Sequence, residues 1–92
     1  MPKRLLVIDP IPTHRIRLRA ALRAAHYDIV SIDRIASVAG AVAARPVDLI
    51  ILNTSGADPA MMMSRLHQSI GRPDTPVLCR DDAAGPLRRV QA

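Results

Sequence analysis

The chain has 92 residues, of which 49% are hydrophobic, and its formal net charge is +5 at pH 7. This length fits one domain with a modest core, and this apolar content excludes a disordered chain. The single cysteine excludes an internal disulfide and a cysteine-rich zinc site, while the excess of arginine reflects either a compositional bias or an acidic or nucleic-acid partner.

A short apolar run predicts the first strand at residues 5–8. Asp9 and Pro10 follow it, and the strand must end there because a proline cannot donate a hydrogen bond to a strand ladder. A helix is predicted from Pro12 to about Ala25, with Thr13 as its cap, because apolar residues recur on one face at helical spacing. These residues are Leu18, Ala21, Leu22 and Ala25.

A basic stripe is predicted along another side of this helix, where arginines recur at every fourth position. The stripe consists of Arg15, Arg19 and Arg23. Two interpretations stay open at this point. The stripe is either a solvated outer face or a docking surface for an acidic partner.

The middle of the chain predicts two further strands with a short helix between them. Residues 27–32 form the second strand, and Ser37 can cap a helix that ends at Arg45, since Pro46 prevents its continuation. The apolar run from Val47 to Asn53 is too short for an ordinary helix. It suits a strand that is covered by helices on both faces of a parallel sheet.

The last third of the chain predicts a helix, a strand and a final helical turn. Asp58 before a proline favours a helix start, and Gly71 suits the helix end. A methionine cluster on this helix is either an adaptable binding surface or part of the core. It consists of Met61, Met62 and Met63. The fourth strand is predicted at residues 75–79, and Asp81 or Asp82 could cap a last turn or two through Leu87 and Val90.

Three of these predicted strands resemble strands of the receiver domain of bacterial response regulators. Lys3–Asp9 resembles that family's first strand, which ends in an acidic pair. Pro46–Asn53 resembles the third strand, which ends in the phosphoacceptor aspartate, and Thr75–Cys79 resembles the fourth, which leads to a switch serine or threonine. The resemblance implies an α/β fold with a flavodoxin-like, doubly wound parallel sheet of four strands in the order 2-1-3-4.

The resemblance also implies a phosphoacceptor pocket, and here the sequence departs from the family. In the family, carboxylates hold Mg²⁺, an aspartate attacks the phosphoryl group, and a hydroxyl and a lysine bind its oxygens. Asp9 matches the first acid, but Pro10 stands at the second, Asn53 replaces the nucleophile and Asp81 falls where the hydroxyl belongs. We therefore expect a degenerate pocket without catalytic residue, metal or cofactor. A residual cation site of Asp9, Asp81 and the Asn53 carbonyl is the alternative.

A full receiver has a fifth strand and a fifth helix, and we expect both to be absent from this single receiver-like domain at residues 1–92. The edge of the fourth strand would then be unpaired, which favours association. Three explanations stay open. The chain is a fragment of a longer protein, it completes itself as a dimer, or it is a natural short form.

The predicted function is a signalling module of a bacterial phosphorelay (two-component) or cyclic-dinucleotide pathway. It would catalyse no reaction and would act in the cytoplasm on a protein partner or output domain, or as a homodimer, without a membrane span. Its candidate surface combines the basic stripe with the methionine cluster. The first alternative is a response regulator that is still phosphorylated on an aspartate, for which Asp81 is the nearest candidate. The second is nucleic-acid binding through the arginines, which the lack of interleaved aromatic residues disfavours.

The histidines and the cysteine predict no catalytic or metal-binding site. The three histidines lie on or beside predicted helices without metal-ligand spacing, so exposed or capping roles are expected for them. They are His14, His26 and His67. Cys79 lies within a predicted strand, where a thiol is usually an inert packing residue.

Overall fold

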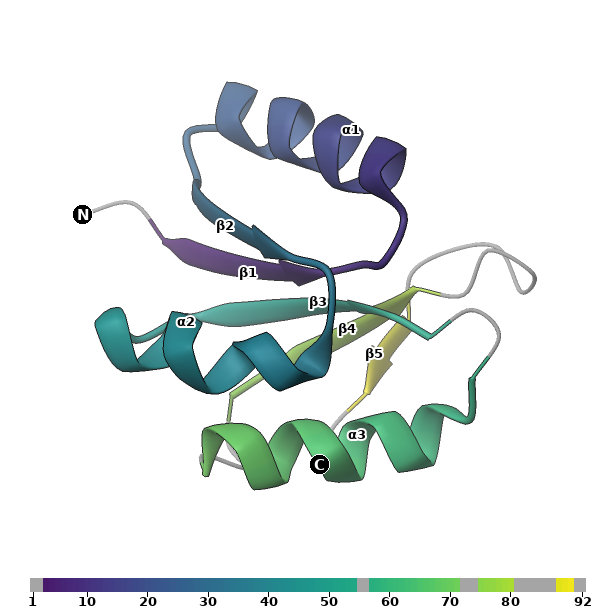
Figure 1. The fold of residues 1–92 in the computed structure, drawn as a ribbon. Helices are drawn as coiled ribbons and strands as arrows, with labels where there is room; N and C mark the ends of the chain where they lie inside the picture. Colours follow the sequence, from purple (N-terminus) through teal and green to yellow (C-terminus); the bar gives the residue numbers. More distant parts are fainter. Residues whose placement is uncertain (1–2, 55–56, 72–74, 81–87, 91–92) are drawn as a thin grey trace.

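One sheet in the strand order β2-β1-β3-β4-β5 forms the centre of the molecule (Figure 1). The structure is a computed structural model that describes residues 3–54, 57–71 and 75–80, and the backbone of residues 88–90. Its elements in chain order are β1 (Arg4–Ile8), α1 (Pro12–Ala24), β2 (Asp28–Ile32), the 3-10 turn η1 (Ile35–Ser37), α2 (Val38–Ala44), β3 (Leu49–Asn53), α3 (Pro59–Ile70), β4 (Val77–Arg80) and β5 (Arg88–Val90).

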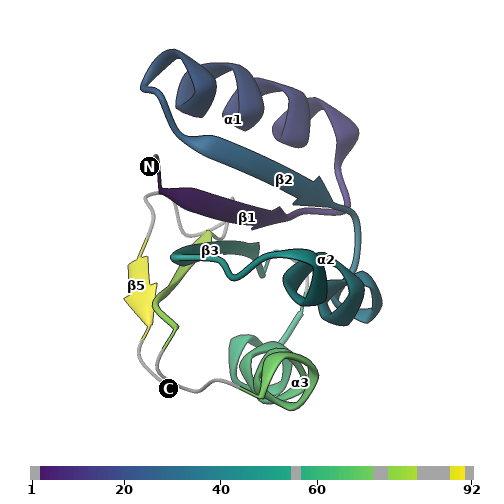
Figure 2. The same ribbon diagram turned by 90° about the vertical axis from the view of Figure 1, so that its left-hand side faces the viewer.

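The first four strands are parallel, so the predicted α/β class and the order 2-1-3-4 are confirmed. β1 and β3 lie at the centre and are the most apolar strands, and all five residues of β1 are buried. α1 covers one face of the sheet, while α2 and α3 cover the other (Figure 2). Strands with helices on both faces need apolar side chains on both sides, which explains their continuous apolar runs.

The two faces of the sheet carry cores of different size. On the face of α1, Leu18 and Leu22 pack against a small cluster of buried strand residues, and no residue of α1 is itself fully buried. That cluster consists of Leu5, Val7, Ile29 and Ile51. On the other face, Met63 and Leu66 of α3 and Val38 of α2 are buried on the alternate strand residues. The side of α2 and α3 therefore holds the larger core.

The predicted caps at both ends of α3 are confirmed, and the predicted span of α1 is confirmed to within one residue. The Asp58 side chain accepts a hydrogen bond from the Ala60 N–H at 3.1 Å, and Gly71 ends the helix in the left-handed conformation with φ 63°. The predicted cap Thr13 is wrong, whereas Ser37 stands at the N-cap position of α2, as predicted, but makes no side-chain cap hydrogen bond. Thr13 lies inside α1, which begins after Ile11, and Ser37 lies in η1 with no side-chain bond to the helix that follows.

The end of the chain differs from the predicted helical turn. Residues 88–90 form β5, which runs antiparallel to β4 and pairs Val90 with Val77 and Arg88 with Cys79. The prediction of a helix through Val90 is therefore wrong, and so is the expected open edge of the fourth strand. The physical reason is that the edge of β4 offers unpaired backbone groups, and a returning strand satisfies them. Asp81, Asp82 and Leu87 lie outside the described residues.

No helix in the described part of the chain is long and apolar enough to cross a bilayer. This agrees with the absence of a long apolar run from the sequence.

Candidate functional site

The carboxyl ends of β1 and β3 bring Asp9 and Asn53 to the same edge of the sheet. The register pairs Ile8 with Leu52, so Asp9 and Asn53 each follow one member of a paired position. Both are buried, with 1% of Asp9 and 4% of Asn53 exposed. In open α/β sheets, sites form at this end of the strands, as the sequence predicts here.

Asp9 has hydrogen-bond partners within the turn that connects β1 to α1. Its Oδ1 accepts a hydrogen bond from the Ile11 N–H at 2.9 Å, and its Oδ2 lies 3.1 Å from Nδ1 of His14. Its backbone carbonyl accepts a hydrogen bond from the Arg15 guanidinium at 2.7 Å. Both carboxylate oxygens are therefore engaged by protein groups, and this acid holds the start of α1 against the end of β1.

Sequence reasoning missed the role of His14, for which an exposed or capping role was expected. The available signal was its position in the first turn of a helix that begins three residues after an acid. Within that turn, a side chain can reach back to the strand end. The distance to Asp9 Oδ2 is a hydrogen bond when Nδ1 carries the proton, because an ionised carboxylate only accepts.

Asn53 is the last residue of β3, at the end where β3 pairs with β4. Its register partner is Arg80. The next residue, Thr54, is buried and donates its N–H to the Arg80 carbonyl at 2.7 Å, while its hydroxyl lies 3.4 Å from the same oxygen. The amide of Asn53 carries no charge and its nitrogen lone pair is delocalised. It therefore cannot act as the attacking carboxylate would.

Among the described pocket residues, none adds a second acid beside Asp9. Pro10 is exposed and follows Asp9 directly, where its ring offers neither a charge nor an N–H donor. Asp81 lies outside the described residues.

One further carboxylate lies at this end of the sheet, and sequence reasoning did not single it out. Asp33 follows β2 in the same way that Asp9 follows β1, and its oxygens lie 3.1 and 3.3 Å from the Arg34 guanidinium. The hydrogen bond from Arg34 lowers the pKa of Asp33, and the same bond raises the pKa of Arg34. Asp33 is exposed and forms an ion pair with Arg34, so it does not replace a second buried acid.

The described residues do not fit a Mg²⁺ ion. Magnesium requires near-octahedral oxygen ligands, normally with one or two carboxylates directed at the ion. Here the two oxygens of the buried Asp9 carboxylate contact the Ile11 N–H and the His14 ring. Among the described residues, no group of three or more histidine, cysteine, aspartate or glutamate side chains could hold a metal ion.

The predicted partner surface is divided between two faces of the molecule. The basic stripe lies on α1 and the methionine cluster on α3, and these helices cover opposite faces of the sheet (Figure 2). Arg15 is half-buried on the Asp9 carbonyl, whereas Arg19 and Arg23 are exposed. The stripe and the methionines therefore do not form one continuous surface.

The methionine cluster itself divides into surface and core. Met61 is 55% exposed, Met62 is half-buried against the core, and Met63 is buried with its sulfur 4.0 Å from the sulfur of Cys79. Cys79 is buried as well, in agreement with the packing role expected for it.

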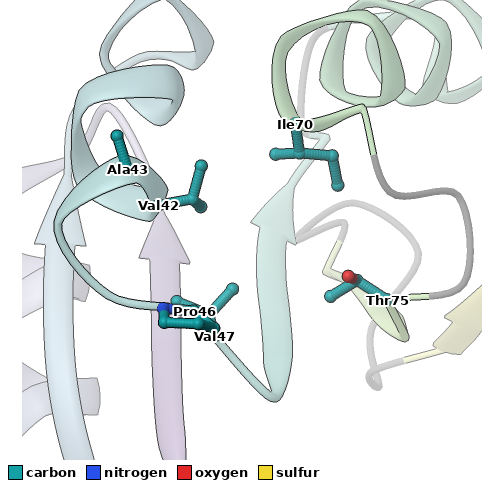
Figure 3. A pocket seen from close by; sticks show the side chains of 6 residues that line it. All are labelled: Val42, Ala43, Pro46, Val47, Ile70 and Thr75. Carbon is teal, nitrogen blue, oxygen red and sulfur yellow. The ribbon is translucent and has the colours of Figure 1, made fainter.

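An apolar hollow of about 320 Å³ lies far from Asp9 and Asn53, at the amino ends of β3 and β4 (Figure 3). Figure 3 shows the side chains of the C-terminal parts of α2 and α3 facing each other across it. Its described lining consists of Val42, Ala43, Pro46, Val47, Ile70 and Thr75. These side chains carry no charge and no catalytic group, so they add nothing to the chemistry of the sheet edge.

Comparison with known proteins supports the fold. No family model matches the chain, and a comparison with curated proteins gives no match either. Among solved structures, the signal receiver domain of an HD domain-containing protein from Pseudomonas fluorescens Pf-5 is similar, with a TM-score of 0.68 and 22% sequence identity. The match covers 85% of this chain and 57% of that chain, so this chain spans little more than half of the solved one. The chain therefore has the fold of a signal receiver domain.

Proposed function

We propose that the chain is a receiver-like signalling module that is not phosphorylated and acts through protein–protein interaction or dimerisation. Its setting is a two-component or cyclic-dinucleotide pathway in the bacterial cytoplasm, and it catalyses no reaction. The receiver fold supports a signalling role. The chemistry of the sheet edge supports the absence of phosphorylation.

One observation carries this proposal, namely the contacts of Asp9. An acid that held Mg²⁺ would direct an oxygen at the ion together with other oxygen ligands, whereas the two oxygens of Asp9 contact the Ile11 N–H and the His14 ring within its own turn. The neighbouring strand end carries Asn53, an amide, where the family has its nucleophile. Without a metal ligand set among the described residues, and with an amide at the end of β3, neither half of the phosphoryl-transfer chemistry is supported.

The similar solved structure supports a multidomain setting. It is a receiver domain of a protein that also contains an HD domain. A receiver-like unit that binds a neighbouring output domain needs no phosphoryl chemistry of its own. In such a protein, the surface of this module would carry the function.

The deciding experiment is treatment with acetyl phosphate and Mg²⁺ followed by intact-mass measurement, with an active receiver as the positive control. We expect no phosphoryl adduct on the native chain. We expect none on Asn53→Asp either, since that change restores the nucleophile but leaves Asp9 engaged and Pro10 in place of the second acid. Labelling of the native chain would instead support a regulator phosphorylated on another aspartate. Robust labelling of Asn53→Asp would show that the metal site is intact.

Sedimentation velocity at several protein concentrations separates the two modes of action. A dimer-forming module shifts to a larger species as concentration rises, whereas a module that binds a different partner stays monomeric.

A further inference from the structure

The outer edge of β2 is open in the described part of the chain. β2 pairs with β1 alone. The N–H of Asp28 donates to the Lys3 carbonyl at 2.9 Å, and the Ile32 carbonyl accepts a hydrogen bond from the Asp9 N–H at 3.1 Å. Because the backbone groups of a strand alternate in direction, those of Ile29 and Ser31 face away from β1. An edge of this kind is a template for a further strand.

A small hollow lies beside this open edge, between β2 and α1. Its volume is about 130 Å³, and it is lined by Pro12, Arg15, Ile16, Arg19 and Ser31. Ile16 is 67% exposed, more than the other exposed large apolar side chains of the described residues. The hollow is smaller than the roughly 300–1,000 Å³ of small-molecule sites, but it suits one side chain of a strand lying along β2.

The charge around the edge is positive and is not neutralised by neighbouring acids. α1 contains four arginines and one histidine and no acidic residue. The acids nearby have other partners, since Asp28 pairs with Arg45 at 3.4 Å and Asp33 pairs with Arg34. Within the described residues, Arg19 and Arg23 make no ion pair with an acid. An extended segment that docks here therefore meets guanidinium groups on its α1 side.

A second copy of the chain is a poor occupant of this edge. If two β2 strands paired around a two-fold axis, each α1 would lie beside its symmetry mate. Two helices that carry only basic charges would then face each other, which disfavours association. The edge itself is complementary to a chain of opposite charge.

We infer that the open edge of β2 binds an extended acidic segment of a partner protein as an added strand. The segment would pair with the backbone groups of Ile29 and Ser31, place one apolar side chain against Ile16, and direct carboxylates toward Arg19. Main-chain hydrogen bonds supply affinity in this mode, and alternate side chains supply specificity. This inference rests on the proposed function as an interaction module and names its partner class and docking edge.

The test uses a fluorescein-labelled peptide with the repeat Glu-Thr-Val-Thr, in which glutamate and valine lie on the same face of a strand because side chains alternate between the two faces. It is titrated with the full chain at low ionic strength and followed by fluorescence anisotropy. We expect saturable binding that weakens about tenfold in Arg19→Glu, the effect of losing about one charge-assisted contact. The matched control is Arg17→Glu, which makes the same charge change on an exposed residue of α1 outside the hollow and should bind within about twofold of the native chain.

Backbone pairing is tested separately from charge. Ser31→Pro removes one N–H that faces the open edge, and an edge strand tolerates such a proline, so binding should fall about tenfold while the fold persists. If that variant does not fold, two measurements on the native chain decide the question. A backbone N-methylated version of the peptide should not bind, and amide exchange of Ile29 and Ser31 should slow when the unmethylated peptide is added.

Several results would overturn the inference. One is the absence of saturable binding, and another is equal binding of the N-methylated peptide or of a peptide with lysine in place of each glutamate. A third is an equal loss of binding in Arg17→Glu and Arg19→Glu. The last is an RNA oligonucleotide that displaces the peptide and binds Ser31→Pro as tightly as the native chain. None of them concerns phosphorylation. The acetyl phosphate experiment can therefore fail or succeed independently of this one.

Discussion

Asp9 is the residue that joins the end of β1 to the start of α1 through contacts within one turn. In a metal-binding pocket the carboxylate faces an ion, whereas here it accepts a backbone N–H and contacts an imidazole within the same turn. Arg15 adds a contact to its carbonyl. The acid is buried, so these partners replace the water that would otherwise solvate its charge. Asp9 therefore stabilises the junction of β1 and α1.

Replacing Asp9 by alanine should lower the free energy of unfolding by about 1–3 kcal/mol, because the Ile11 N–H and the His14 ring lose a buried acceptor. Urea denaturation measures this change. Asp9→Asn is the matched control and should cost less, since its amide oxygen still accepts one hydrogen bond. If alanine is tolerated without loss, the carboxylate has no structural role and remains available for a ligand.

His26 is a second residue with a specific effect on stability, which comes from its backbone conformation. It follows the C-cap residue Ala25 of α1 and has φ 68°, and its N–H donates to the Arg23 carbonyl while the Tyr27 N–H donates to the Leu22 carbonyl. This is the pair of bonds that ends a helix in a Schellman motif, whose left-handed position favours glycine.

His26→Gly should raise the free energy of unfolding by about 1 kcal/mol, since it removes the steric cost of a left-handed side-chain-bearing residue. Thermal unfolding followed by circular dichroism measures it. Ala25→Gly is the control, because Ala25 has φ −90° and gains nothing from glycine. The explanation fails if the two glycines have the same effect.

At the scale of elements, α1 and α3 are attached to the sheet with different strength. α3 buries Met63 and Leu66 and has an acidic cap, whereas α1 has no fully buried residue and no side-chain cap. Local stability follows the buried apolar contacts of an element. α1 is therefore the helix that can most easily adjust its position beside the open edge of β2.

Leu66→Ala should cost about 2–5 kcal/mol of unfolding free energy, because Leu66 is fully buried in the larger core. Leu22→Ala makes the same chemical change on α1 and should cost less, since Leu22 is only partly buried. Urea denaturation compares the two variants directly. Equal costs would mean that α1 is packed as firmly as α3.

For the whole molecule, β5 decides how the sheet ends on the side of β4. It is antiparallel to β4, so it covers an edge that a four-stranded parallel sheet would leave open. Covering that edge removes unpaired backbone groups that would otherwise attract another chain. The other edge, at β2, remains open among the described residues, which makes the two ends of the sheet functionally different.

A chain that ends at Leu87 lacks β5 and should associate with increasing concentration, because the edge of β4 becomes available for pairing. Light scattering after size-exclusion chromatography measures the mass. A chain that ends at Val90 retains β5 and should behave like the full chain. If both shortened chains stay monomeric, β5 is not what protects this edge.

The sequence by itself determined the positions of the four parallel strands, the start and end of α3, and the amide of Asn53 at the sheet edge. These features depend on local chemistry, such as the apolar run that ends at Asn53 and the acidic cap at Asp58. Only the tertiary structure decided that the His14 ring contacts the Asp9 carboxylate, and that the basic stripe and the methionines lie on opposite faces of the sheet. It also decided that residues 88–90 return as the strand β5. Each of these depends on which groups meet after the chain has packed, and neither periodicity nor propensity along the sequence contains that information.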